Sequence, residues 1–206
     1  MIRPHDASVS EHEWRSFLVS QGFGQLVAPG GPNRQLPVIV PTQFSLTEDA
    51  IVFHLAKANP VFEALEENPV AVMSVAGDWA YVPTTFKALA TENPHDFVPT
   101  TYYAAVQVTG EIEIIDNPEA LAAVLGVQLD ELEPAEGLAD ATLHTKKYAA
   151  IRGLRLPVDP ERVQAKFKYG GNVDAAHQDR AAEMLAGRDG PGDAAALSHL
   201  TRRRVQ

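Results

Sequence analysis

The chain has 206 residues, of which 45% are hydrophobic and 21% charged, a balance typical of one packed globular domain. It contains no cysteine, which excludes disulfides and thiolate metal sites and agrees with a cytoplasmic location. Its net charge of −10 argues against direct nucleic-acid binding, which depends on neutralising phosphates with lysine and arginine. We expect no membrane contact either, because no apolar run approaches the roughly 20 residues that span a bilayer.

Periodicity and turn residues predict the elements of the first half of the chain. In chain order they are a helix over 11–20, two strands within 22–44 joined by a turn at 29–32, a strand over 50–56, a helix over 59–68, a strand over 69–77 that 78–86 extends or follows, and a long loop over 87–99.

The same reasoning covers the second half. It predicts a strand over 101–116 with a kink at Gly110, a helix over 118–132, a loop, a helix and a strand within 134–158, a turn and a basic segment over 159–172, and a helix over 173–187. The arginines of TRRRVQ, at 201–206, are interpreted as a frayed, solvated end.

Several predicted strands are neighbours in sequence, and the helices do not alternate with them one for one. This order favours an α+β fold of mainly antiparallel β structure, a sheet closing into a barrel with peripheral helices. No glycine-rich nucleotide-binding motif is present, which argues against a doubly wound parallel sheet. We expect a single domain over 1–206, in which 165–206 holds the basic motif, a terminal helix and the tail.

The segment HLAKANP, at 54–60, brings His54, Lys57 and Asn59 together between a predicted strand and a predicted helix. The start of a helix exposes backbone N–H groups and a partial positive charge, which suits a phosphate group. Asn59 can also cap the helix through its side chain. In the alternative interpretation Asn59 is only this cap and Lys57 is only solvated, and spacing alone leaves both open.

A second segment, VPTTYYAAV, places Thr101, Tyr102 and Tyr103 at the start of a predicted strand. These side chains could line a planar ligand or build a dimer interface. Threonine and tyrosine are also common strand formers, so the segment has an ordinary structural explanation as well.

A third segment, KFKYGGN, contains Lys166 and Lys168, whose alternate positions point to one face of a strand. Asn172 follows after a pair of glycines. The lysines suit an anion, or they protect an exposed sheet edge from pairing with other strands.

The sequence contains no common motif of a metal site or of a serine hydrolase. The seven histidines form no H-x-x-x-H or H-E-x-x-H pair, and no G-x-S-x-G occurs. These absences leave a metal site and hydrolases of these types unsupported, and we name no metal ligand and no catalytic residue.

Taken in order, FGQLVAPG, QLPVIV, HLAKANP, AYVPTTF, VPTTYYAAV and KFKYGGN resemble the PaiB-type FMN-binding family, over about residues 17–185. The resemblance implies a six-stranded FMN-binding split β-barrel, related to pyridoxamine 5′-phosphate oxidases. It also implies a homodimer that holds FMN in the groove between its subunits. The cofactor-binding residues that it implies are His54, Lys57 and Asn59 at the phosphate, Leu36 and Val38 in a strand beside the isoalloxazine, Thr101, Tyr102 and Tyr103 at the dimer seam, and Lys166, Lys168 and Asn172 near the site.

Three functions follow as alternatives. One is a flavin-dependent oxidoreductase, in which the flavin itself carries the chemistry. Another is a flavin-sensing or transcriptional regulator without turnover, a label often given to this family. The third is a split barrel for another planar cofactor, haem or a deazaflavin, with His54 or His95 as the candidate axial ligand for haem. The chain departs from the family near the predicted ligand, for example with Gln35 where members carry histidine.

Overall fold

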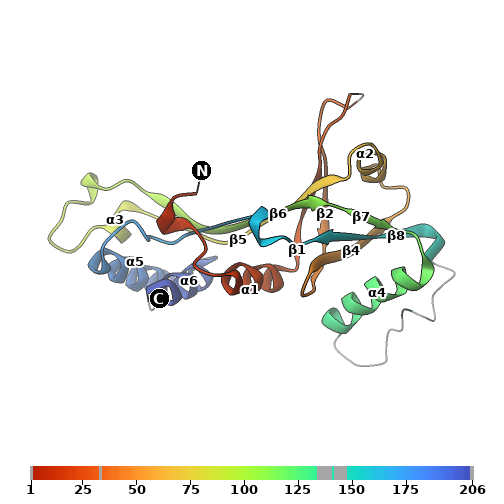
Figure 1. The fold of residues 1–206 in the computed structure, drawn as a ribbon. Helices are drawn as coiled ribbons and strands as arrows, with labels where there is room; N and C mark the ends of the chain where they lie inside the picture. Colours follow the sequence, from red (N-terminus) through yellow and green to blue (C-terminus); the bar gives the residue numbers. More distant parts are fainter. Residues whose placement is uncertain (1, 33, 134–140, 142–147, 205–206) are drawn as a thin grey trace. The chain divides into compact units, whose positions relative to one another are not determined.

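The computed structural model describes residues 2–32, 34–133, 141 and 148–204 (Figure 1). Its helices are α1 (Glu11–Gln21), α2 (Val61–Glu67), α3 (Thr84–Lys87), α4 (Pro118–Leu132), α5 (Ala175–Arg188) and α6 (Asp193–Arg204). Its strands are β1 (Phe23–Ala28), β2 (Val38–Gln43), β3 (Ser45–Leu46), β4 (Ala50–Ala56), β5 (Val70–Val82), β6 (Thr100–Glu111), β7 (Glu113–Ile115), β8 (Ile151–Pro157) and β9 (Val163–Lys168). No helix of these residues has the length and apolar character needed to cross a membrane.

Most of the predicted elements are present, and α4 and β4 have the predicted bounds. The described residues contain nine strand segments rather than six, because short strands such as β3 leave little sequence signal. The strand expected over Leu36–Val38 begins only at Val38. Pro37 precedes it, and a proline cannot donate a hydrogen bond to a strand ladder. The helix expected within 134–158 lies outside the described residues.

The predicted kink at Gly110 does not interrupt the strand. Strand β6 runs through Gly110 to Glu111, and the break comes at Ile112. A Cβ atom at Gly110 would lie 3.1 Å from Leu156 Cδ1 and 3.2 Å from the Pro157 carbonyl oxygen. Glycine therefore serves close strand packing here rather than a bend.

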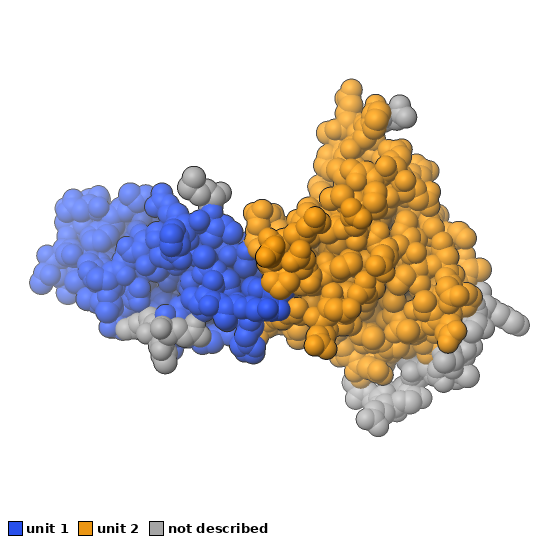
Figure 2. Space-filling view, in the orientation of Figure 1, with its two compact units in different colours: residues 1–14, 76–106, 165–206 blue, residues 15–75, 107–164 orange. Residues whose placement is uncertain are grey.

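The strands form two sheets. One has the order β2-β1-β5-β6-β9 and the other the order β3-β4-β8-β7. The pairings of β1 with β2 and β5, of β4 with β3 and β8, and of β7 with β8 are antiparallel, as predicted. Residues 1–14, 76–106 and 165–206 make one compact unit, called unit 1, and residues 15–75 and 107–164 make unit 2 (Figure 2).

In unit 2 the core is built around β4. Ile51 and Phe53 are fully buried on one face of this strand. On the other face, Ala50 and Val52 pack against Val124 of α4. Burying such side chains stabilises the fold by about 1.5–3 kcal/mol each, so the apolar run of β4 accounts for its place between helix and sheet.

In unit 1 the terminal helices α5 and α6 pack against each other. Leu185 of α5 and Leu200 of α6 are buried, as is Phe167 of β9. The prediction of a frayed end at TRRRVQ is therefore wrong, because its first four residues belong to α6.

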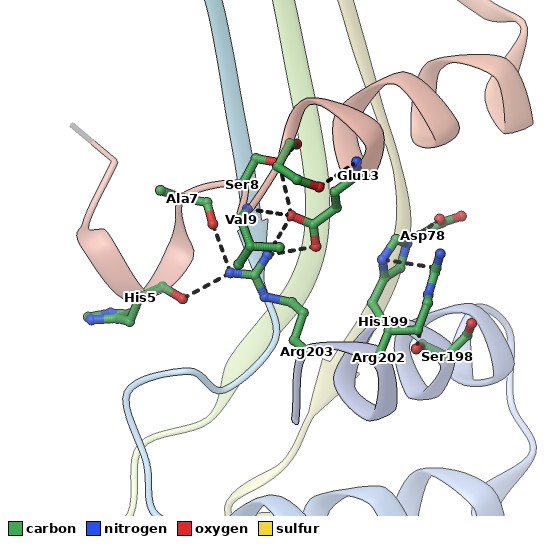
Figure 3. A network of polar contacts seen from close by, with 11 residues as sticks. His5, Ala7, Ser8, Val9, Glu13, Asp78, Ser198, His199, Arg202 and Arg203 are labelled. Atoms are coloured by element: carbon green, nitrogen blue, oxygen red, sulfur yellow. Dashed lines mark hydrogen bonds and ion pairs between the residues drawn. The ribbon is translucent and has the colours of Figure 1, made fainter. Parts of the chain in front are cut away.

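Arg203 shows why this end is ordered. Its guanidinium donates to both carboxylate oxygens of Glu13, at 2.8 and 2.9 Å, and to the carbonyl oxygen of Ala7, at 2.8 Å (Figure 3). Both charged side chains are only 12% exposed. A buried, hydrogen-bonded ion pair of this kind is costly to break, so it holds α6 in place.

Candidate functional site

The loop after β4 has the strand–loop–helix form that the sequence predicted. The N–H of Lys57 donates to the carbonyl of Ala150 at 2.8 Å, and the N–H of Asn59 donates to the carbonyl of Ala56 at 2.8 Å. The Asn59 side chain accepts from the N–H of Val61 at 3.0 Å. Asn59 is thus occupied as the cap of α2, which was one of the two interpretations of this residue.

Lys57 is exposed and lies close to an ion-pair cluster. Arg152 donates to Asp116 at 2.7 and 2.8 Å and to Glu66 at 2.7 Å, and it stacks over the Phe62 ring. These hydrogen bonds lower the pKa of the Asp116 carboxyl, and the charge of Lys57 lowers it slightly further. Among the described residues, no hydrogen bond or ion pair engages the Lys57 ammonium, so it is available to an anion.

The described hydrogen bond of His54 is to a residue of α4 and not to Lys57. This histidine follows Phe53 on β4, and its ring lies on the side of α4, where Nδ1 is 2.7 Å from Gln128 Oε1. His54, Gln128 and the leucines of α4 line a cavity of about 340 Å³. The described hydrogen bond of His54 is thus to α4, and its grouping with Lys57 at one phosphate stays a prediction.

A second cluster lies in unit 1, where β6 and β9 are neighbours. The ammonium groups of Lys166 and Lys168 lie 5.4 and 5.9 Å from the centre of the Tyr103 ring. Lys168 also donates to Thr100 Oγ1 at 2.6 Å. Lysines within about 6 Å of a ring interact with its π-face, so the alternation in KFKYGGN does place both charges beside one aromatic group.

The neighbours of Tyr103 divide between the two faces of β6. Thr101 alternates with Tyr102 and shares the partly exposed face with Tyr103. Tyr102 is buried on the core face, where its ring meets Tyr169 edge-on, and burial raises its pKa to about 12. Tyr102 therefore lies on the opposite face of β6 from Tyr103, and it can support the cluster only by packing in the core.

Asn172 is exposed in the turn that follows β9. Gly170 in this turn has φ +75°, and a Cβ atom there would lie 2.6 Å from the Tyr102 hydroxyl. A glycine is required at that point, so the Gly–Gly pair of KFKYGGN has a structural explanation.

Leu36 and Val38 belong to unit 2. Leu36 is 77% exposed, and Val38 opens β2, which packs against α2 and β4. The predicted residues therefore form two groups. Leu36, Val38, Lys57 and Asn59 belong to unit 2, and Thr101, Tyr103, Lys166, Lys168 and Asn172 belong to unit 1.

The sequence pattern did not indicate two polar residues of these sites. Thr100 lies shortly before the tyrosine pair, and its Oγ1 accepts a hydrogen bond from Lys168. Gln128 occupies a buried position of α4, in line with the buried Leu121 and Val124. A glutamine where helical periodicity calls for a leucine was the signal that could have identified it.

The chemistry of these groups fits FMN. Lys57, Lys166 and Lys168 are cations for a phosphate, and Tyr103 and Leu36 offer accessible apolar surface for a ring system. Among the described residues, no three histidine, aspartate or glutamate side chains are placed to hold a metal ion.

Several solved structures share this fold. The FAD and heme binding protein from Mycobacterium smegmatis is 22% identical, with a TM-score of 0.64 over 86% of this chain and 80% of its own. The flavocytochrome Anf3 from Azotobacter vinelandii is 20% identical, with a TM-score of 0.62 over 84% and 74%. A conserved hypothetical protein from Mycobacterium tuberculosis is 18% identical, with a TM-score of 0.61 over 84% and 94%. These likenesses confirm the predicted α+β split barrel. No curated protein matches the sequence.

A family model described as "Putative FMN-binding domain" matches residues 1–160. The match includes the loop of Lys57 and the tyrosines of β6 but ends before Lys166 and Lys168. It covers more than half of the chain, and with the shared fold it confirms the resemblance on which the FMN prediction depends. The chain belongs to this FMN-binding family.

Proposed function

We propose that the chain is a cytoplasmic, PaiB-type protein that binds FMN and acts as a flavin-dependent oxidoreductase. The observation that carries the proposal is the family match over residues 1–160, which contains the β4–α2 loop and its available lysine. A bound flavin supplies hydride transfer, while the protein binds and orients it.

In this proposal each residue has a role set by its surroundings. Lys57 holds the phosphate, and Asn59 positions the loop by capping α2. Backbone groups of Leu36 and Val38 meet the polar edge of the ring.

The residues of unit 1 form a second, separate cationic group. Lys166 and Lys168 add positive charge beside Tyr103, Thr101 lies on the same face, and Asn172 offers an exposed amide. These charges suit the anionic part of the cofactor or of a substrate.

We also propose a homodimer, formed by the uncovered face of the sheet in unit 2. Antiparallel register places Val27 beside Ile39 on one side and Val72 on the other, and Phe23 lies on the same face of β1. Phe23 is 55% exposed and Ile39 is 56% exposed. An apolar sheet face of this kind marks an interaction surface, and a second copy provides the matching face.

Titration of the purified protein with FMN tests the proposal. We expect flavin absorbance near 450 nm to stay with the protein through gel filtration, at about one FMN per chain. Mass spectrometry of the released ligand then distinguishes FMN from FAD, haem and a deazaflavin. A colourless protein that takes up no added FMN would contradict the proposal.

A further inference from the structure

The cavity beside α4 in unit 2 combines an apolar wall with several polar side chains, one of which is held in a fixed orientation. Leu125, Leu129 and Leu132 lie at spacings of four and three along α4, and their side chains line the cavity. Leu125 and Leu129 are only half-buried by the described residues. A volume of about 340 Å³ is within the range of small-molecule sites, and such sites pair apolar walls with a few polar groups.

The oriented polar side chain is His54, and its partner fixes its tautomer. The oxygen Oε1 of Gln128 can only accept a hydrogen bond, so the neutral His54 ring donates to it from Nδ1. The other nitrogen, Nε2, then presents a lone pair. His54 itself lines the cavity, so a bound molecule meets a hydrogen-bond acceptor there.

The burial of Gln128 supports a functional reason for this pair. Only 7% of Gln128 is exposed, and it lies in the stripe of α4 that elsewhere carries Leu121 and Val124. Burying an amide costs free energy, and a leucine would fill the same position without that cost. We attribute the presence of a glutamine at this position to its role in orienting the His54 ring.

The remaining lining selects against negative charge. Glu133 carries a carboxylate, Gln43 is neutral, and the Tyr148 hydroxyl donates to the carbonyl oxygen of Ala141. No lysine or arginine lines the cavity among the described residues. Repulsion from the Glu133 carboxylate therefore disfavours a bound anion. A compact molecule with a flat or branched apolar body and one hydroxyl donor matches the leucines and Nε2 together.

We propose that this cavity binds an uncharged aromatic alcohol, with its hydroxyl group donating to His54 Nε2 and with Gln128 as the positioning residue. The site is separate from the proposed phosphate contact at Lys57. It therefore does not depend on FMN binding.

The test is a fluorescence titration of the full chain with 2-naphthol, with 2-methylnaphthalene and 2-naphthoate as matched ligands. We expect 2-naphthol to bind best, because the methyl compound lacks the donor and the carboxylate is charged. Since a net hydrogen bond contributes about 1 kcal/mol, His54→Phe should weaken 2-naphthol about five- to tenfold and leave 2-methylnaphthalene unchanged. His95→Phe is the matched control, because His95 is exposed in a short 3-10 helix (Pro94–Asp96) of unit 1.

Gln128→Leu tests the positioning role. It should weaken 2-naphthol and shift the ¹⁵N signals of His54 away from a single tautomer, a change that a purely structural residue would not cause. Leu125→Trp should abolish binding by filling the cavity. If Leu125→Trp fails to fold, His54→Phe still tests the site, because His54 is exposed and its replacement should leave the fold intact.

Three results would overturn the proposal. They are equal binding of 2-naphthol and 2-methylnaphthalene, no loss in His54→Phe, and displacement of 2-naphthol by FMN. Displacement would place the flavin in this cavity. A protein that takes up no FMN but binds 2-naphthol as described would contradict the proposed function and leave this inference standing.

Discussion

At the scale of single residues, the β4–α2 loop shows that chemical type alone does not assign a role. His54, Lys57 and Asn59 lie within six positions, yet each has a different kind of surroundings. Asn59 is engaged by the backbone of α2, and His54 by Gln128. Lys57 alone of the three has a charge near solvent with no described ion pair, so we assign the anion to it.

Reversing the charge of Lys57 should weaken FMN. A hydrogen bond to a charged group contributes about 1.5–3 kcal/mol, so Lys57→Glu should raise the Kd for FMN at least tenfold. Arg162→Glu changes the net charge equally but lies at a different cavity, with Thr109 and Asp159, and should leave the Kd unchanged. Isothermal titration of both variants checks this, and an unchanged Kd in Lys57→Glu would show that the phosphate lies elsewhere.

At the scale of elements, the sequence predicted strands and helices whose apolar spacing is strong, such as β4 and α4. It failed where the stabilising partner is distant in sequence. Arg203 reads as a solvated tail because its partner Glu13 lies 190 positions away. The hydrogen bond of His54 to α4 has the same origin, since Gln128 becomes visible as a partner only after α4 packs beside β4.

Helix α6 also contains a buried histidine, His199, which is 4% exposed. Its Nε2 lies 2.7 Å from Asp78 Oδ2, and Arg202 lies 3.3 Å from its Nδ1 (Figure 3). Arginine only donates, so neutral His199 accepts at Nδ1 and donates from Nε2 to Asp78. The ring also stacks on Tyr169, at 4.6 Å between centres.

This arrangement makes the docking of α6 depend on pH. Burial lowers the pKa of His199, and the charge of Arg202 acts in the same direction, while Asp78 and Glu13 oppose them. The unfolded chain therefore binds a proton more readily than the folded chain does. The stabilising contribution of His199 is complete above its ordinary pKa of about 6.5 and is lost as the pH falls below that value.

Replacing His199 by glutamine isolates this effect. The amide can donate to Asp78 and accept from Arg202, but it does not titrate. Thermal unfolding between pH 8 and pH 5 should show the Tm of the natural chain falling more steeply than that of His199→Gln. All other titrating groups are common to both proteins, so parallel curves would show that His199 does not control this stability.

At the scale of the whole molecule, two features act against each other. The sheet face around Phe23 and Ile39 favours association, because it exposes apolar surface. The net charge of −10 on each chain opposes it, since two copies repel each other. Salt screens exposed charges over about 8 Å at 0.15 M, so added salt should strengthen a dimer held together by apolar burial.

Substitutions on this face should therefore separate the subunits. Burying a large apolar side chain contributes about 1.5–3 kcal/mol, and a lysine in its place adds a desolvation cost. Phe23→Lys and Ile39→Lys should each raise the dimer Kd at least tenfold in sedimentation velocity, and together they should give a monomer at micromolar concentration. Val98→Lys is the matched control, because Val98 is 73% exposed but belongs to a loop of unit 1 and not to the sheet face that carries Phe23 and Ile39. If the natural chain were a monomer at every concentration and salt level, the exposed face would need another partner. Dissociation by Phe23→Lys with loss of bound FMN would instead support a flavin site that requires both subunits.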